Sequence, residues 1–596
     1  MPVPAVETRT AAVCRNARGE YRIVMAARGF ACIVDPAKGT EKQVFFPSRD
    51  YPFTCIGASD GTFYTGAGKT VIALDPFTGT ILRTWTPDCE EEIVGFRLAE
   101  APDGGIYLTT YPGCLLMRLD PRSGHLETVA RLDEKQKYTF SLACDSAGWV
   151  YAGIGTERHN VVAFCPGTGE MRSFVPEPQR RQGTGQVLQT VDGGVYASWE
   201  QDDDGRPVWM RMSGGTAEPA APPLPKPVIS GSGFAAVHGA LPPPLVLESC
   251  SLSEREVVIR NEDTGERKTI RLSYVSEGAD LSPLALGPDG RIYGTSNHPL
   301  HLYAYDPSGD TLIHYGSRAI ERGDGGNICA YASQGPILAG AAYAGGHLHL
   351  IDTSRPFQWG TSGEERNPKL VTSHPEVHRP RCALALADGE HVIYGGFPDY
   401  GAVGGGLVIY NLRTGSDEVI PHGRLVPEQS TVCLAQLADG RIVGGTSVET
   451  PGGAEPKARE AELYVLDWKT RTVTQRWIPF PGVREISLLK AYTSHCVSGL
   501  TCDSLLFVFD LNLGEVIYRC DLSGWGSVVR DGLIVTGEGM VIGALSGALF
   551  KFDPFRFELA GVWKPPHRIT AGLALHNGRI YYASGSELWS VNADVL

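Results

Sequence analysis

Long apolar runs, an excess of basic residues and paired cysteines are all missing from this chain of 596 residues. No stretch is apolar for long enough to cross a bilayer as a helix, so no membrane contact is predicted. The 53 lysines and arginines are outnumbered by 67 aspartates and glutamates. The resulting net charge of -14 argues against a nucleic-acid partner, which selects a basic surface.

The fourteen cysteines stand singly, without a CxxC pair or another zinc-binding spacing. Isolated cysteines in strand-like segments are typical of small buried side chains in a reducing compartment. The chain also has no Asn-x-Ser/Thr sequon and no signal-peptide pattern after Met1. These absences predict a cytoplasmic location, with a signal peptide already removed as the alternative.

Glycine, in contrast, is abundant at 72 residues, and much of it belongs to a repeated turn of the form Asp-Pro-x-Thr/Ser-Gly. The clearest copies begin at Asp35, Asp75 and Asp120, and a degenerate copy begins at Asp306. Copies recur along nearly the whole chain at intervals of about 40 residues, the period of four-stranded repeat units. Asp-Gly turns between apolar runs alternate with this motif, and each marks a hairpin.

These repeats predict an all-β protein made of two β-propellers, each with about six to seven four-stranded blades. The expected domains are an N-terminal propeller over residues 1–270 and a C-terminal propeller over residues 271–596. Residues 570–595 supply only three strands, so an alternative arrangement completes that blade with a strand from residues 11–24. One propeller would then be inserted in the other.

The repeat interval lengthens after Asp352 and again after Asn411, and insertions in repeats often form the binding face. Residues 353–381 are predicted to cross from a fourth strand to the next blade, and residues 447–462 to join a second strand to a third. Together with the loop 395–406, both are expected on one face. The residues expected to meet there, some from neighbouring blades, are His298, His301, Tyr343, Trp359, His374, His378, Arg379, Arg381, Asp399, Tyr400, Glu449 and Glu455.

This mixture of side chains favours an acid–base site for an anionic small molecule or oligosaccharide. Arg379 or Arg381 would pair with a substrate carboxylate. His378 or His374 would act as the base, and Tyr400 as the acid. The other residues would bind substrate, with Trp359 stacking on a sugar ring. As an alternative, His374 and His378 would hold a divalent metal together with His298 or His301.

The units Gly287-Pro288-Asp289-Gly290-Arg291-Ile292-Tyr293 and Asp120-Pro121-Arg122-Ser123-Gly124 resemble those of streptogramin-lyase-like and quinoprotein-like propellers. Several polysaccharide lyase families have propellers of a similar kind, and they place histidine, tyrosine and arginine at the mouth of the channel. The resemblance lies in the fold and carries no motif of catalytic residues. The tryptophan-docking repeats of quinoprotein dehydrogenases are missing.

The function predicted first is therefore a carbohydrate-active lyase, a carbon–oxygen lyase that cleaves a uronate-containing glycoside by β-elimination. A glycoside hydrolase is the second reading, in which two of Glu449, Glu455, Glu460 and Glu462 form a carboxylate pair. The third is a non-catalytic scaffold that binds a protein or a glycan on a flat face.

Overall fold

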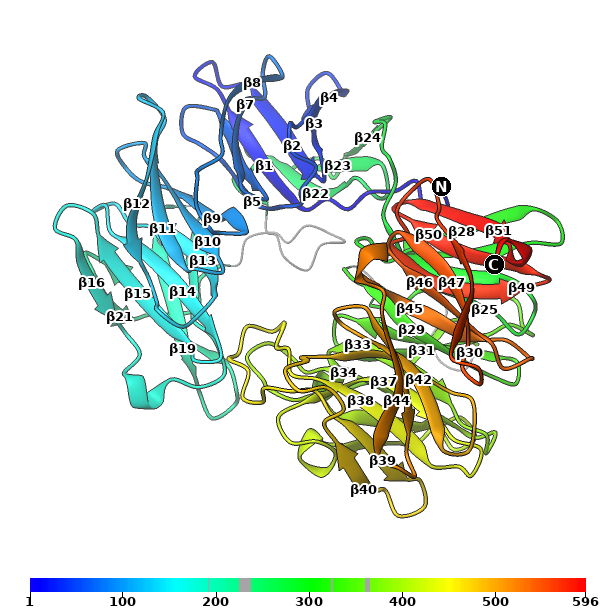
Figure 1. Ribbon diagram of the computed structural model, residues 1–596. Coiled ribbons are helices and arrows are strands. Elements are labelled where there is room, and N and C mark those ends of the chain that lie inside the picture. Colours follow the sequence, from blue (N-terminus) through cyan, green and yellow to red (C-terminus); the bar gives the residue numbers. More distant parts are fainter. Residues whose placement is uncertain (191, 225–236, 323–324, 360–364) are drawn as a thin grey trace. The chain divides into compact units, whose positions relative to one another are not determined.

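The computed structural model describes residues 1–596 except 191, 225–236, 323–324 and 360–364 (Figure 1). Within these residues the secondary structure consists of strands and short 3-10 helices, so the chain is all-β. The strands form thirteen antiparallel sheets, most of them four-stranded, and each sheet follows the chain order. No helix among the described residues is long and apolar enough to span a membrane.

Two compact units make up the chain: an N-terminal unit, Ala5–Ser276, and a C-terminal unit, Glu277–Leu596 together with Met1–Pro4. The expected boundary at residue 270 falls inside the last strand of the N-terminal unit. Residues 11–24 lie in the first sheet of that same unit, where they pair with each other. They therefore do not complete the last sheet of the C-terminal unit, as the alternative arrangement required.

The N-terminal unit holds the first six sheets. Their strands are β1 (Thr10–Arg15), β2 (Tyr21–Ala27), β3 (Phe30–Asp35), β4 (Thr40–Phe45); β5 (Pro52–Gly57), β6 (Phe63–Ala67), β7 (Thr70–Asp75), β8 (Thr80–Trp85); β9 (Ile93–Glu100), β10 (Ile106–Tyr111), β11 (Leu115–Asp120), β12 (His125–Arg131); β13 (Tyr138–Cys144), β14 (Val150–Thr156), β15 (Asn160–Cys165), β16 (Glu170–Ser173) with β17 (Gly183–Thr184); β18 (Gln186–Gln189), β19 (Val195–Gln201), β20 (Pro207–Ser213), β21 (Thr216–Pro219); and β22 (Leu245–Ser251), β23 (Glu256–Asn261), β24 (Arg267–Arg271).

The C-terminal unit holds the other seven sheets. Their strands are β25 (Leu281–Leu286), β26 (Ile292–Ser296), β27 (Leu302–Asp306), β28 (Thr311–Gly316); β29 (Asn327–Gln334), β30 (Ile337–Tyr343), β31 (His347–Asp352), β32 (Lys369–Ser373); β33 (Arg379–Ala385), β34 (His391–Phe397), β35 (Leu407–Asn411), β36 (Asp417–Ile420); β37 (Ser430–Gln436), β38 (Ile442–Ser447), β39 (Leu463–Asp467), β40 (Thr472–Trp477); β41 (Ile486–Ala491), β42 (Cys496–Thr501), β43 (Leu505–Asp510), β44 (Glu515–Asp521); β45 (Val528–Val535), β46 (Val541–Leu545), β47 (Ala548–Asp553), β48 (Glu558–Trp563); and β49 (Ala571–His576), β50 (Arg579–Ser584), β51 (Glu587–Asn592).

The repeated aspartate stabilises the turn between the third and fourth strands. In the first copy, the Asp35 carboxylate accepts hydrogen bonds from the backbone N–H groups of Ala37 (3.0 Å) and Lys38 (3.1 Å). Gly39 then takes a φ of 70°, a conformation that strains residues with a Cβ atom. The motif therefore fixes the register of the outer hairpin and carries no chemistry of its own.

In most of the four-stranded sheets the second and third strands are largely buried. The fourth strand is partly exposed, with alternate residues facing solvent, as in β44. In the C-terminal unit the first strands β25, β29, β33, β37, β41 and β45 each contact the first strand of the next sheet. The series ends at β49, which contacts both β45 and β25. The Leu281 N–H also donates a hydrogen bond to the carbonyl of Gly585, which follows β50 (2.8 Å).

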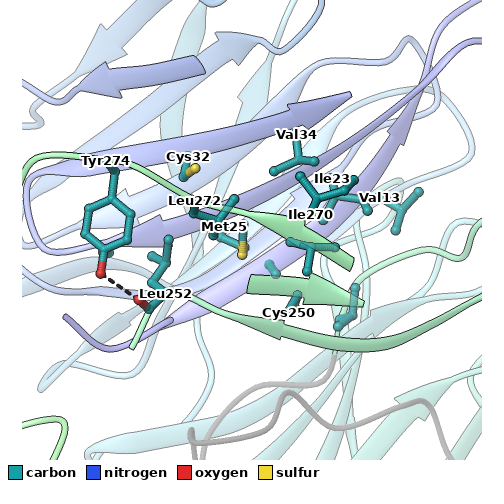
Figure 2. Close-up of a cluster of buried hydrophobic side chains, with 14 of the residues drawn as sticks. Val13, Ile23, Met25, Cys32, Val34, Cys250, Leu252, Ile270, Leu272 and Tyr274 are labelled. Atoms are coloured by element: carbon teal, nitrogen blue, oxygen red, sulfur yellow. Dashed lines mark hydrogen bonds between the residues drawn. The ribbon is translucent and has the colours of Figure 1, made fainter. Parts of the chain in front are cut away.

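The N-terminal unit has the same succession from β1 through β5, β9 and β13 to β18. Its last sheet, β22–β24, packs on its first sheet, β1–β4, through a shared apolar core (Figure 2). Met25 and Ile23 lie against Leu272 and Ile270 there, and the Tyr274 hydroxyl donates a 2.6 Å hydrogen bond to the Leu252 carbonyl.

All fourteen cysteines are free thiols, and nine of them are buried. Burial raises the pKa of Cys14, Cys32 and Cys250 to about 12, which makes them inert apolar side chains at neutral pH.

Candidate functional site

Five of the expected site residues meet in the C-terminal unit, at one end of adjacent sheets. Tyr343 ends β30, and His378 follows the short 3-10 helix η3 (Pro375–Val377) in the crossover from β32 to β33. Arg379 begins β33, and Asp399 with Tyr400 lies in the loop between β34 and β35. Successive antiparallel strands alternate direction, so these crossovers and second-to-third-strand loops share one end of the sheets.

The His378 imidazole is the centre of this group. Its side chain is 13% exposed, and its Nδ1 lies 3.4 Å from the Asp399 carboxylate. Its ring meets those of Tyr343 and Tyr400 edge to face, with centroids 5.5 and 5.7 Å away. The Nε2 atom is buried without a hydrogen-bond partner among the described residues, which makes it available to a ligand.

Arg379 covers both tyrosine rings. Its guanidinium carbon lies 4.3 Å from the ring centroid of Tyr400 and 5.2 Å from that of Tyr343. Its Nη1 is buried and has no hydrogen-bond partner within the described part of the chain. An unpaired guanidinium nitrogen is costly, and a bound carboxylate would satisfy it.

The two tyrosine hydroxyls lie 3.5 Å apart, and either atom can be the donor. Burial, followed by the neighbouring Tyr400, raises the pKa of Tyr343 well above its ordinary value of 10. The Tyr343 phenol therefore keeps its proton at neutral pH and is able to donate it. His298, in the loop between β26 and β27, adds its ring edge-on to Tyr343 at 6.2 Å.

The electrostatics of the group keep His378 neutral. Burial lowers its pKa to about 4; Asp399 opposes the shift, and the positive charge of Arg379 adds to it. Because the carboxylate faces Nδ1, the favoured tautomer carries its proton there and leaves the Nε2 lone pair free. A neutral base thus lies beside a fixed cation and a protonated phenol.

A second layer of charge lies among the first strands of the C-terminal unit. Burial and the nearby Arg530 of β45 lower the pKa of Arg381 to about 10, so Arg381 stays charged at neutral pH. β33 and β45 are not neighbours in the succession of sheets, so the charge of Arg530 acts on Arg381 from a sheet that does not adjoin its own. Burial also raises the pKa of Asp531, while Lys490 opposes that shift.

These inner residues, other than Arg381, are absent from the predicted site. Arg530, Asp531 and Lys490 belong to first strands. Asp531-Gly532 is predicted from the sequence as an Asp-Gly hairpin turn, and that prediction is wrong: both residues lie inside β45, which runs on to Val535. A charged residue inside the first apolar run of a repeat is the pattern that would identify them, although Arg530 is exposed and Asp531 and Lys490 are only partly buried.

Two expected histidines lie elsewhere with partners of their own. The His374 Nε2 lies 2.6 Å from the Asp417 carboxylate and 2.8 Å from the Thr372 hydroxyl. His301 is buried against His314, with 3.0 Å between Nδ1 and Nε2. Burial lowers the pKa of His301 to about 3.

Trp359 does not join the group, and the reason is topological. The insertion that contains it does not cross between sheets: residues 353–368 join β31 to β32, and the crossover starts only at His374. This connection lies at the opposite end of the strands from His378. Trp359 instead packs edge-on to Tyr315 of β28, with centroids 6.0 Å apart.

The second insertion does join β38 to β39, and its backbone supports the group. The Gly401 N–H donates to the Gly452 carbonyl at 3.0 Å, beside Asp399 and Tyr400. Its carboxylates have separate partners: Glu449 binds Arg484 (2.5 Å), and Glu462 binds Arg476 (2.7 Å). Glu455 lies in the same insertion, between Gly452 and Glu460.

The histidines of the metal alternative do not form a ligand set in the described residues. The group with metal-ligand spacing found there is His495, Cys496 and Asp510. Its aspartate already caps a repeat turn, accepting from the N–H groups of Asn512 and Leu513.

Comparison with known proteins returned no matching family model and no matching curated sequence.

Proposed function

We propose that the C-terminal unit is a seven-bladed propeller with a site for β-elimination on uronate-containing glycosides, and that the N-terminal unit is a six-bladed propeller. The cyclic succession of first strands, β25 through β49, supports the first ring. The packing of β22–β24 on β1–β4 supports the second. The observation that carries the activity is that His378, Arg379, Tyr343 and Tyr400 lie in contact with one another. Two buried polar atoms of this group, the Nε2 of His378 and the Nη1 of Arg379, have no hydrogen-bond partner among the described residues.

In this proposal the substrate carboxylate binds the Arg379 Nη1 atom. Neutralising that charge acidifies the hydrogen on the adjacent carbon, since the carbanion formed there delocalises into the carboxylate. Stacking on the two tyrosine rings holds the guanidinium plane, so little entropy is lost when the substrate binds.

The Nε2 atom of His378 removes that hydrogen as a proton. The electron pair of the C–H bond forms a carbon–carbon double bond, and the bond from the next carbon to the glycosidic oxygen breaks. Tyr343 or Tyr400 protonates the leaving oxygen. Asp399, facing Nδ1, stabilises the imidazolium that forms, so Asp399 is a positioning residue.

The hydrolase reading lacks a specific observation in its favour. It requires two carboxylates on either side of one bond. Glu449 and Glu462 instead neutralise two different arginines.

The test is a matched pair of substrates. Uronate oligosaccharides and their carboxyl-reduced, neutral counterparts are incubated with the protein while the ultraviolet absorbance of the unsaturated product is followed. We expect an increase with the acidic oligosaccharides alone. Release of saturated sugars would establish hydrolysis instead, and equal turnover of the neutral substrates would exclude the role of Arg379.

A further inference from the structure

The N-terminal unit contains a cavity of about 550 Å³ that the lyase proposal does not use. It is lined by the first strands of successive sheets, β1, β5, β9, β13 and β18, and by Val237 and His238. Most of its wall is apolar or neutral, including Phe53, Leu98, Phe140 and Leu142. Arg97 of β9 is the basic side chain among the charged residues of the wall.

An irregularity in β9 brings Arg97 to the cavity. The pairing with β10 is regular at Leu98 and Leu108, then shifts before it resumes at Val94 and Thr110. Bulges of this kind re-aim a side chain out of the regular alternation. The backbone N–H of Arg97 donates a 3.2 Å hydrogen bond to the Thr109 hydroxyl inside the irregular segment, and this hydrogen bond stabilises the bulge.

The guanidinium is fixed by two carbonyls and has no counter-ion. Nε donates to the Phe140 carbonyl and Nη1 to the Phe96 carbonyl, both at 2.7 Å. Within the described residues Nη2 has no hydrogen-bond partner, and Arg97 forms no ion pair. Burial and the charge of Arg9 lower the pKa of Arg97 to about 10, which leaves it protonated at neutral pH.

The other charged groups nearby are already neutralised or satisfied. Arg9 binds Glu7 at 2.7 Å. Glu100, at the far end of β9, accepts from the N–H and the hydroxyl of Ser59. Asp145 accepts from the Tyr151 hydroxyl and the Gly214 N–H. Three residues of extended chain, roughly 10 Å, separate Arg97 from Glu100.

We infer that this cavity binds a small organic carboxylate, with its anionic group on Arg97 and its apolar body against Phe53 and Phe140. A charged guanidinium enclosed without a carboxylate is unfavourable, and an anion of matching geometry relieves that cost. The apolar wall selects a ligand with a hydrophobic part over a bare inorganic anion. The inference does not depend on the lyase activity of the other unit.

The test is a calorimetric titration of the full-length protein with benzoate, its neutral analogue benzamide, and inorganic phosphate. We expect measurable binding of benzoate alone. Arg97→Gln should weaken it by about 10- to 100-fold, the range of a hydrogen bond to a charged group. Arg97→Lys should retain part of the affinity, since it keeps the charge without the planar fork.

Arg379→Gln is the matched control, because it removes the proposed carboxylate contact of the other unit and should leave benzoate binding at Arg97 unchanged. Loss of binding in Arg379→Gln with retention in Arg97→Gln would overturn the inference, and so would binding of phosphate alone or of no probe. Hydrogen exchange of the wild-type protein gives a second readout that needs no variant: benzoate should protect β9 and β13. An unchanged exchange pattern there would also contradict the inference.

Discussion

First strands of both units contain β-bulges, but the charged side chains at these bulges differ between the two units. Their first strands carry a register irregularity at corresponding places, in β9 and β13 of one unit and in β33 and β45 of the other. In the N-terminal unit this segment presents Arg97, held by carbonyl oxygens. In the C-terminal unit it presents Arg381, Arg530 and Asp531.

The surroundings of these charges differ as well. Arg381 and Arg530 have the ionisable groups Glu485, Lys490 and Asp531 around them, and the His378 group lies on the same set of sheets. Arg97 faces a cavity whose wall combines apolar side chains with polar ones. Under our two proposals, one kind of sheet succession would support proton transfer in one unit and would enclose an apolar acid in the other. Four variants or conditions sharpen this contrast.

The largest effect is expected from His378→Ala. Removing the base should lower kcat by about 10²- to 10⁴-fold, the usual contribution of general acid–base catalysis. The measurement is the rate of unsaturated product formation under saturating uronate oligosaccharide. His374→Ala is the matched control: its Nε2 contacts the Asp417 carboxylate away from the His378 group, so its rate should stay within about threefold. Equal losses in both variants would refute the assignment of the base.

Arg379→Gln should lower kcat/KM for acidic oligosaccharides by about 10- to 100-fold, through loss of a charge-assisted contact to the carboxylate. The control is Arg413→Gln in the same sheet, where the 71% exposed side chain pairs with Glu390 at 3.0 Å. If Arg379→Gln left the preference for acidic over carboxyl-reduced substrates unchanged, the carboxylate would bind elsewhere.

The repeats predict most of the fold because their chemistry is local. Asp35 bonds the N–H groups of its own turn, and most Asp-Gly pairs close a hairpin without help from distant residues. The same local reasoning fails for the insertion after Asp352. The position of this insertion relative to β32 depends on which segment pairs with β31. Residues 369–373, which do pair with it, carry no turn motif that would identify them as the fourth strand.

In the candidate site, too, the features that depend on local sequence could be predicted, and those that depend on distant residues could not. Its contributing loops can be assigned from strand alternation, and His378, Arg379 and Tyr400 do meet. The partners of His374 and Glu449 could not be predicted in this way, because Asp417 and Arg484 come from other parts of the fold. Arg97 and Arg530 could not be predicted as site residues either. A bulge that changes the direction of one side chain depends on how neighbouring strands pair.

Acid should destabilise the C-terminal unit more than the N-terminal unit. Among the described histidines with a shifted pKa, all lie in the C-terminal unit. Burial lowers the pKa of His301 to about 3 and that of His349 and His378 to about 4. These values lie below the unfolded value of about 6.5, so the unfolded state binds protons first. Stability is full above pH 6.5 and declines as pH falls toward 4.

Each such group reduces the free energy of unfolding by about 1.4 kcal/mol per pH unit in that window. Hydrogen exchange at pH 7 and pH 5, corrected for intrinsic rates, should show a greater loss of protection in β25–β51 than in β1–β24. His349→Gln should reduce the difference, because its side chain is fully buried with Nε2 on the Glu321 carbonyl (2.9 Å). Equal losses in both units would contradict the role of the buried histidines.

The smallest effect is expected from Glu449→Gln. The carboxylate binds Arg484, and both side chains are 46% exposed, so the pair contributes no more than about 1 kcal/mol to stability. In a lyase that uses His378, this substitution should change kcat by less than about threefold. A hydrolase with Glu449 as acid or nucleophile would lose about 10²-fold or more. The same product assay therefore separates the two reactions, and a large loss in Glu449→Gln would move the active site from the His378 group to the second insertion.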